Sequence, residues 1–120
     1  MRLDKLVETQ LESILTPIEC SLLEGQIVEA IQTIFDPEIP INIYELGLIY
    51  DVTVLPSGLA HISMTLTSPA CPAAQSLPAE VEQKTRAVNG VTDLKLDLVW
   101  EPPWSIDLMS EEAKLELGLL

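Results

Sequence analysis

The sequence predicts an α+β domain in which a small mixed β-sheet of about three strands is covered by helices on one face. Two runs of alternating apolar and polar residues are joined by a short turn, which is typical of a β-hairpin. A third alternating run follows a helical stretch, so we expect a helical crossover to the third strand. The predicted order is therefore helix, strand, strand, helix, strand, with a short helix at the C-terminus.

An amphipathic helix is predicted over residues 1–15. We treat residues 1–20 as an N-terminal helical extension and residues 21–120 as the main domain. Apolar residues recur at helical spacing, and Thr16-Pro17 ends the pattern. So many aliphatic side chains are not left in water, and we expect them to pack against the chain's own core or a second copy. The stripe consists of Leu3, Leu6, Val7, Leu11, Ile14 and Leu15.

A second helix is predicted from Ser21, because Glu24 follows three residues later and the two can form a capping box. Its apolar stripe consists of Leu23, Ile27, Ile31 and Ile34. We expect it to end at Phe35, since Pro37 disfavours helical geometry at the residue before it.

The hairpin follows from strict alternation on both sides of Pro56-Ser57-Gly58. In the first strand, Tyr50, Val52 and Val54 are expected to face inward, with Asp51 and Thr53 outward. In the second strand, the predicted inward residues are Ala60, Ile62, Met64 and Leu66.

The third helix begins either after Pro72 or at Leu77, with Pro78 in its first turn, and the pattern does not decide between these starts. Asn89-Gly90 is expected to end it as a left-handed C-cap. Residues 91–100 alternate again and predict the third strand, with Leu94, Leu96 and Leu98 inward. Ser110 is expected to cap a short acidic helix that begins with Glu111 and Glu112.

The charge balance excludes nucleic acid and anionic membranes as partners. The formal net charge is -13 over 120 residues, whereas a phosphate-binding surface needs clustered Lys and Arg. No Lys or Arg lies between Leu6 and Gln83, so this stretch either attracts metal cations or a basic partner, or serves as a solvated surface. No apolar run approaches the ~18 residues of a membrane span, which favours a single soluble domain.

The two cysteines, Cys20 and Cys71, lack the C-x-x-C spacing of a zinc finger, and His61 is the single histidine. This pattern excludes a zinc finger and a disulfide scaffold. The N-terminus lacks the features of a signal peptide, so we expect a reducing, cytoplasmic compartment.

Cys71 is the strongest candidate for chemistry, because the segment around it leaves a strand and enters a helix. With Pro72 at the first helical position, Cys71 would be the N-cap, where free amides and the helix dipole favour the thiolate. The acidic surroundings oppose this effect. The alternative is a buried, inert cysteine that serves as a small hydrophobic residue.

Asp36-Pro37-Glu38 places two carboxylates at the expected C-terminus of a helix, where the dipole disfavours negative charge. They could bind a metal ion or transfer protons. The alternative is a solvated Asx turn, which is an ordinary use of Asp before Pro.

The remaining chemistry-bearing residues have structural interpretations. His61 lies mid-strand on the polar face and is expected to be exposed, and Cys20 is expected to be a packing residue or a free thiol. Trp100 and Trp104 flank Pro102-Pro103 and either close the core or form an exposed anchor.

Four segments together resemble successive motifs of the SufT and PaaD-like iron-sulfur cluster assembly family, over about residues 22 to 120. They are DPEIPINI at 36–43, ELGLIYDV at 45–52, MTLTSPACP at 64–72 and VWEPPW at 99–104. The C-terminal SEEAKLELG at 110–118 is similar to the SufT branch. Four motifs in the right order with compatible spacing are a specific signal.

The resemblance implies an iron-sulfur assembly fold related to the C-terminal domain of NifU-type scaffolds, and a role in maturing iron-sulfur proteins. It also implies a shared site. Cys71, Thr67 and Ser68 would contact the iron or iron-sulfur cluster, and Cys71, Asp36 and Glu38 would be the metal ligands.

One reactive cysteine cannot supply the four thiolates that a cluster generally takes. Two routes remain: a cluster bridged in a homodimer, with Cys71 from each chain, or transient capture of iron or a cluster on its way to a client. Carboxylates suit iron ions and the thiolate suits cluster iron. We favour transient handling by a non-enzymatic accessory factor of the SUF type, with the assembly machinery and apo client proteins as partners.

Three alternatives stay open. An adaptor that binds no metal would recruit the machinery through Trp104 and the acidic face, with Cys71 dispensable. A PaaD-like factor would mature an oxygenase complex. An enzyme with Cys71 as nucleophile is disfavoured, because catalysis needs a base and His61 is predicted on a strand.

Overall fold

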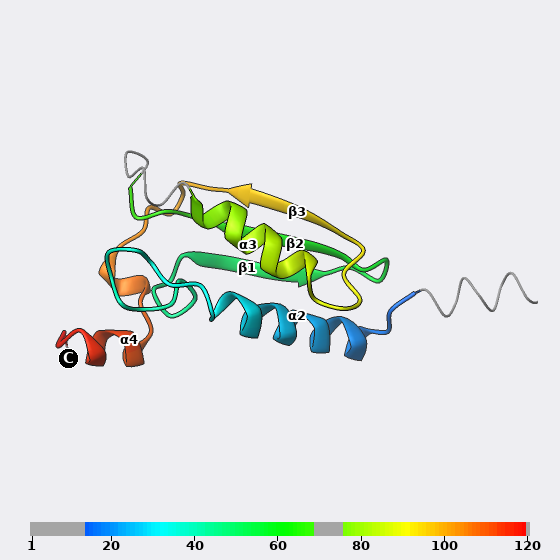
Figure 1. Cartoon of the computed structure of the whole chain (residues 1–120), viewed down its shortest axis with the longest axis horizontal. Helices are drawn as coiled ribbons and strands as arrows, with labels where there is room; N and C mark the ends of the chain where they lie inside the picture. Colours follow the sequence, from blue (N-terminus) through cyan, green and yellow to red (C-terminus); the bar gives the residue numbers. More distant parts are fainter. Residues whose placement is uncertain (1–13, 69–75, 120) are drawn as a thin grey trace, which may run out of the picture.

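The computed structural model describes residues 14–68 and 76–119. Its elements are α2 (Pro17–Ile31), β1 (Ile49–Val54), β2 (Leu59–Met64), α3 (Leu77–Arg86), β3 (Asp93–Leu98), the 3-10 helix η2 (Ile106–Leu108) and α4 (Glu111–Glu116) (Figure 1). This order confirms the predicted α+β fold. In the two described ranges, no helix is long and apolar enough to cross a membrane.

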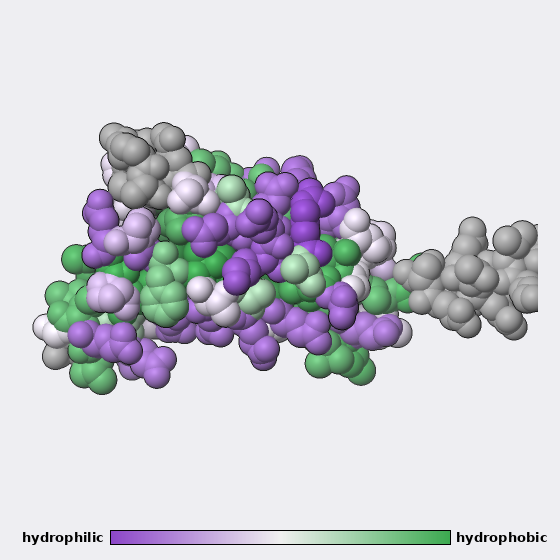
Figure 2. Space-filling view, viewed as in Figure 1, coloured by the Kyte–Doolittle hydropathy of each residue, from purple (hydrophilic) through white to green (hydrophobic). Residues whose placement is uncertain are grey.

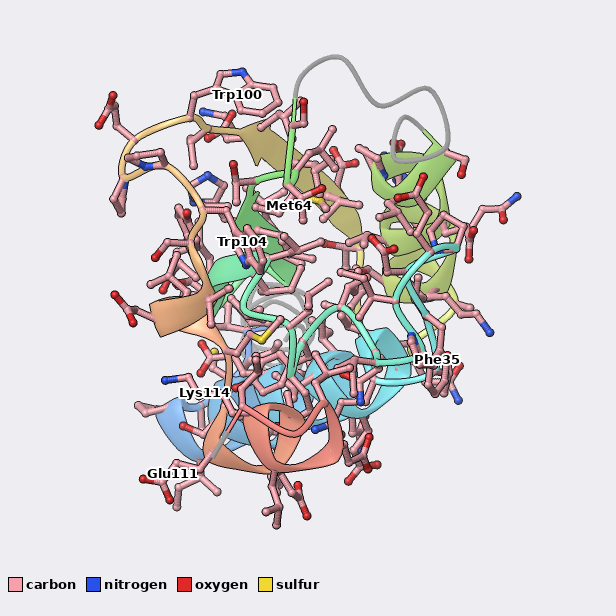
Figure 3. All side chains as sticks on the ribbon, turned by 90° about the vertical axis from the view of Figure 1, so that its left-hand side faces the viewer. Phe35, Met64, Trp100, Trp104, Glu111 and Lys114 are labelled. Atoms are coloured by element: carbon pink, nitrogen blue, oxygen red, sulfur yellow. The ribbon has the colours of Figure 1, made fainter. Side chains whose placement is uncertain are left out.

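The strand β2 is the centre of a mixed three-stranded sheet, with β1 antiparallel on one side and β3 parallel on the other. The helices α2 and α3 pack against each other and against the sheet (Figures 1 and 3). Ala60, Ile62 and Met64 are fully buried, whereas His61 and Ser63, which alternate with them, are half-buried. The predicted inward face of β2 is therefore confirmed.

The helix α2 begins earlier than the sequence predicts. Thr16 and not Ser21 is the N-cap: the Glu19 amide donates to Thr16 Oγ1 at 3.2 Å, and the Thr16 amide donates to Glu19 Oε1 at 2.9 Å. Both threonine and serine stand three residues before a glutamate, so the sequence offers two capping boxes. Pro17 favours the first, because its fixed φ suits the first helical position.

The predicted helix over residues 1–15 lies largely outside the described residues. Ile14 and Leu15 are not helical, so the prediction is wrong for this pair. The Leu15 amide donates to the Pro56 carbonyl oxygen at 2.7 Å, and the Leu15 side chain packs against the core. Ile14 is 50% exposed.

The helix α2 ends at Ile31 rather than Phe35. The chain turns at Gln32, and residues 32–48 form a loop that is tied together by the Ile43 amide, which donates to the Ile34 carbonyl oxygen at 2.9 Å. The predicted stripe residue Ile34 is buried, but as part of this loop. The loop contributes its own set of core residues: Ile34, Ile41, Ile43, Leu46 and Leu48.

A β-bulge between Ile49 and Asp51 makes the predicted faces of β1 partly wrong. Ile49 and Val52 both pack against the core, although simple alternation would place them on opposite faces. The intervening Tyr50 donates a hydrogen bond from its hydroxyl to the Pro102 carbonyl oxygen at 2.6 Å. A bulge shifts the register without interrupting the apolar pattern, so the sequence does not reveal it.

The helix α3 begins at Leu77, the later of the two predicted starts, and ends at Arg86, before the predicted Asn89-Gly90 cap. Gly90 does have a positive φ of 104°, but it lies in the turn that follows the helix. In β3, Leu94 and Leu96 pack against the core as predicted. The inward prediction for Leu98 is wrong, because this residue ends the strand and is 40% exposed.

Gly47 allows residues 99–110 to close against the loop of residues 32–48. Its φ is +89°, and an added Cβ would overlap the carbonyl oxygen of Leu108. Gly25 lies inside α2 and is different, because a Cβ at that position meets nothing within 4 Å. Adding a Cβ at these two positions should therefore change the stability of the fold in opposite directions.

We expect Gly47→Ala to lower the free energy of unfolding by at least about 2 kcal/mol, through both strain and overlap. Gly25→Ala should raise it by about 0.5–1 kcal/mol, because alanine is the better helix former. Urea unfolding followed by circular dichroism measures both. A neutral Gly47→Ala variant would contradict the close approach of the two segments.

Candidate functional site

The long loops gather at one end of the domain (Figures 1 and 3). Hydrophobic residues are visible on the surface of this end in Figure 2. The parallel strands β2 and β3 both end here, α3 begins here, and the loop of residues 32–48 leads from α2 to the start of β1. In open sheets that contain parallel strands, ligands bind outside the carboxyl ends of the strands. This end is therefore the natural place for a functional site.

The carboxylate of Asp36 has a clear structural role. Its Oδ1 accepts hydrogen bonds from the amides of Glu38, at 2.8 Å, and Ile39, at 3.0 Å. This is the Asx turn that the sequence offered as the alternative to a metal site. Because both bonds use Oδ1, the geometry leaves Oδ2 to contact other groups. Glu38 is exposed.

Thr67 and Ser68 lie three and four residues after Met64, the last residue of β2, and are half-buried. Residues 69–75, with Cys71 among them, lie outside the described residues, and so do the predicted accessibility of Cys71 and its approach to Asp36. The position just before α3 belongs to Ser76, which agrees with the later of the two predicted starts. The N-cap prediction for Cys71 depended on the earlier start, which α3 does not use. Pro78 sets the start of α3 later in the chain.

The described residues bring together no group of three or more His, Cys, Asp or Glu side chains that could hold a metal ion. Cys20 is a free thiol, only 8% exposed, and packs in the core from the first turn of α2. This confirms its predicted packing role.

Hydrogen bonds from two aromatic side chains hold the segment after β3 in place. The sequence did not predict either of them. Trp104 donates from Nε1 to the Leu46 carbonyl oxygen at 2.8 Å, and Tyr50 donates to Pro102. Burial raises the pKa of Tyr50, a hydrogen bond with Thr65 lowers it, and the nearby Glu101 charge raises it. Trp104 is half-buried against the core, which fits the predicted core closure.

Trp100 is 42% exposed at the same end and is labelled with Trp104 in Figure 3. In the sequence, the only signal for the hydrogen bonds of Trp104 and Tyr50 was the spacing of aromatic residues around Pro102-Pro103. That spacing does not reveal their backbone partners.

His61 is half-buried and not simply exposed as predicted. Its Nε2 lies 2.7 Å from Asp97 Oδ2, across the pairing of β2 with β3. The hydrogen bond from His61 is the largest cause that lowers the pKa of Asp97 below its usual 3.8. His61 is thus engaged with a neighbouring strand in the middle of the sheet.

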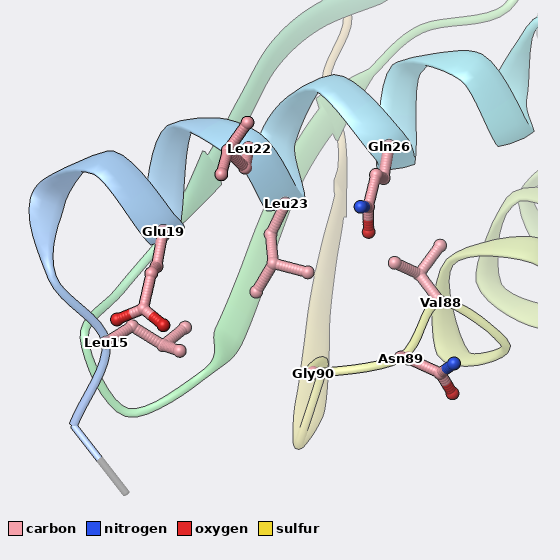
Figure 4. Close-up of a pocket in the computed structure, with 8 residues that line it drawn as sticks. All are labelled: Leu15, Glu19, Leu22, Leu23, Gln26, Val88, Asn89 and Gly90. Atoms are coloured by element: carbon pink, nitrogen blue, oxygen red, sulfur yellow. The ribbon is translucent and has the colours of Figure 1, made fainter. Parts of the chain in front are cut away.

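A hollow of about 540 Å³ lies at the other end of α2, between this helix and the turn after α3 (Figure 4). Leu23 points into it, and Gln26 and Val88 face each other across it. Its one carboxylate is Glu19, which is already used in the capping box of α2. The lining carries no set of metal ligands.

The Asp97 pair predicts a pH dependence. Because the folded pKa of Asp97 lies below 3.8, its contribution to stability is complete above that value and is lost as the pH falls through the lower, folded value. Asp97→Asn should therefore be less stable than wild type at pH 6, and the difference should narrow at pH values below 3.8. Urea unfolding across this range tests it. In a His61→Ala background the effect of Asp97→Asn should shrink, and an unchanged effect would argue against the pair.

The Asx turn predicts a difference between two substitutions of Asp36. Asp36→Ala removes the acceptor and should lower the free energy of unfolding by about 1 kcal/mol. Asp36→Asn keeps an oxygen at Oδ1 and should cost clearly less. Thermal unfolding of the two variants measures the difference. Equal losses of stability would mean that Asp36 stabilises the fold through its charge and not through the turn.

Comparison with known proteins places these features in context. The family model for iron-sulfur cluster assembly protein matches residues 24–96. An Fe-S protein maturation auxiliary factor from Porphyromonas gingivalis is 52% identical over 97 residues, covering 81% of this chain and 92% of the relative. The Fe-S protein maturation auxiliary factor SufT from Staphylococcus aureus is 38% identical over 86 residues, covering 72% and 98%.

A solved structure shares the fold. The crystal structure of a domain of unknown function, DUF59, from Bacillus anthracis superposes with a TM-score of 0.79 at 34% identity. The superposition covers 88% of this chain and 100% of that chain.

Proposed function

Because the chain belongs to the iron-sulfur cluster assembly protein family, we propose that it is an accessory factor that transiently handles iron or iron-sulfur clusters on their way to client proteins. The observation that carries the proposal is the match over residues 24–96, which spans the Asp36 turn, Thr67, Ser68 and Cys71. In this proposal, the iron or cluster is cargo and not a resident cofactor.

The chemistry of the cargo site follows from the residue types. The thiolate of Cys71 would bind cluster iron, and the carboxylates of Asp36 and Glu38 would contact an iron ion. One thiolate leaves a cluster incompletely ligated, so it can be passed to a client whose own cysteines complete the coordination. Thr67 and Ser68, at the end of β2, would line the same place.

No catalytic step is part of the proposal. His61, the one histidine of the chain, is engaged with Asp97, and the proposal assigns no general base to Cys71. The partners are the assembly machinery and apo client proteins, in a reducing cytoplasm that keeps the thiol free.

The test is anaerobic reconstitution of the full chain with ferrous iron and sulfide, followed by absorption and Mössbauer spectroscopy. We expect the wild type to acquire a labile iron-sulfur chromophore and Cys71→Ser to lose it, because the serine hydroxyl is a poor ligand for cluster iron. Transfer is measured as the rate at which an apo ferredoxin gains its cluster from the loaded protein.

Cys20→Ser is the matched control, since Cys20 is in the core, and it should keep the chromophore. Asp36→Asn removes a charge while keeping the turn, so weaker binding of ferrous iron by this variant would support the carboxylate as a contact. If Cys71→Ser binds iron and supports client maturation as the wild type does, the proposal that Cys71 handles the cargo is wrong. That result would favour the alternative of an adaptor that binds no metal.

A further inference from the structure

Two hollows adjoin along the outer side of β1. One, of about 270 Å³, lies between α2 and β1, and the other, of about 520 Å³, lies between β1 and the segment that precedes α4. They share Tyr44, Ile49 and Tyr50 and are therefore immediate neighbours, and we name the two together the edge groove.

Gly25 keeps one wall of the edge groove open. Glycine inside a helix lowers its stability relative to alanine, so a mid-helix glycine usually has a packing reason. Close packing does not explain the glycine at position 25, because a Cβ there would meet no atom within 4 Å. What the missing side chain provides is space in the groove, beside Val28 of the same helix.

The groove also follows an open strand edge. β1 pairs with β2 on one side only. The Leu55 amide donates to Leu59 on the β2 side, so by alternation the amides of Val54 and Val52 face away from β2. Glu24 Oε2 accepts the Val54 amide at 2.9 Å, and Val52 lines the groove two residues earlier.

The charges around the groove all have one sign. Glu24, Glu45 and Asp51 line it, and among the described residues that line it there is no Lys or Arg. A hollow bordered by carboxylates attracts cationic ligands, while Ile49, Val52 and the two tyrosines give it an apolar floor.

We propose that the edge groove binds an extended, basic segment of a partner protein. The backbone of that segment pairs with Val52, its Lys and Arg side chains face Glu45 and Asp51, and its apolar side chains lie over Ile49. Glu24 at one end and the bulge at the other confine backbone pairing to a short stretch, so the contact is brief and reversible. This surface goes beyond the handling of iron, and its use does not depend on Cys71.

The experiment measures the binding of a labelled synthetic peptide of alternating Lys and Val, about ten residues long, to the full chain by fluorescence anisotropy. We expect it to bind, with an affinity that falls as salt rises, and a peptide of alternating Glu and Val not to bind. Gly25→Leu should weaken binding by about tenfold by filling the groove. Leucine is a good helix former, so this variant keeps the fold.

Gln26→Leu is the matched control, since Gln26 faces the separate hollow in Figure 4, and it should bind as the wild type does. Asp51→Lys is a second variant that should weaken binding, and Asp107→Lys, an exposed charge change of the same size outside the groove, should not. Cys71→Ser should bind the peptide normally, which separates this proposal from the handling of iron.

Three results would overturn the proposal. One is no binding of the basic peptide, another is equal binding of the acidic peptide, and the third is unchanged affinity in Gly25→Leu. Sedimentation of the protein alone tests another occupant: a dimer that Gly25→Leu dissociates would mean that a second copy fills the edge groove.

Discussion

The parallel pairing of β3 with β2 is the constraint on which the rest of the structure depends. Parallel neighbours cannot be joined by a tight turn, so the chain must return along the sheet, and it does so as α3. That return buries one face of the sheet against helices. It also brings the ends of β2 and β3 to the same end of the domain, where Thr67 and Ser68 lie and the segment of residues 99–110 begins.

Backbone carbonyl groups organise this end of the domain. The carbonyl of Leu46 accepts from the Trp104 indole, that of Pro102 accepts from Tyr50, and that of Glu45 accepts from the Ser110 amide at 2.9 Å. Each bond joins segments that are far apart in the sequence. Loops held in this way keep a defined shape without helix or strand ladders, because their polar groups are satisfied and their aliphatic residues enter the core.

The proposed cargo site and the edge groove use different parts of this arrangement. The proposed site belongs to the segment after β2 and to the Asp36 turn. The groove follows the outer edge of β1, one side of α2 and the segments around Glu45 and Pro102. Among the described residues, the groove lining includes none of the proposed cargo contacts, so binding in the groove does not use the cargo ligands.

The sequence by itself determined the fold class, the order of elements and the family. Hydrophobic periodicity depends on local geometry, and it placed both hairpin strands, the third strand and the buried faces of Ala60, Ile62 and Met64 correctly. It also presented Asp36 as either a ligand or an Asx turn, and the structure assigns its Oδ1 to the turn.

Only the tertiary structure decided the bulge at Tyr50 and the pairing of His61 with Asp97. The indole contact of Trp104 and the edge groove beside Gly25 were equally hidden in the sequence. Each depends on which distant segments meet. Alternation and spacing describe one element at a time, and they carry no information about the partner that a side chain or a backbone group finds across the fold.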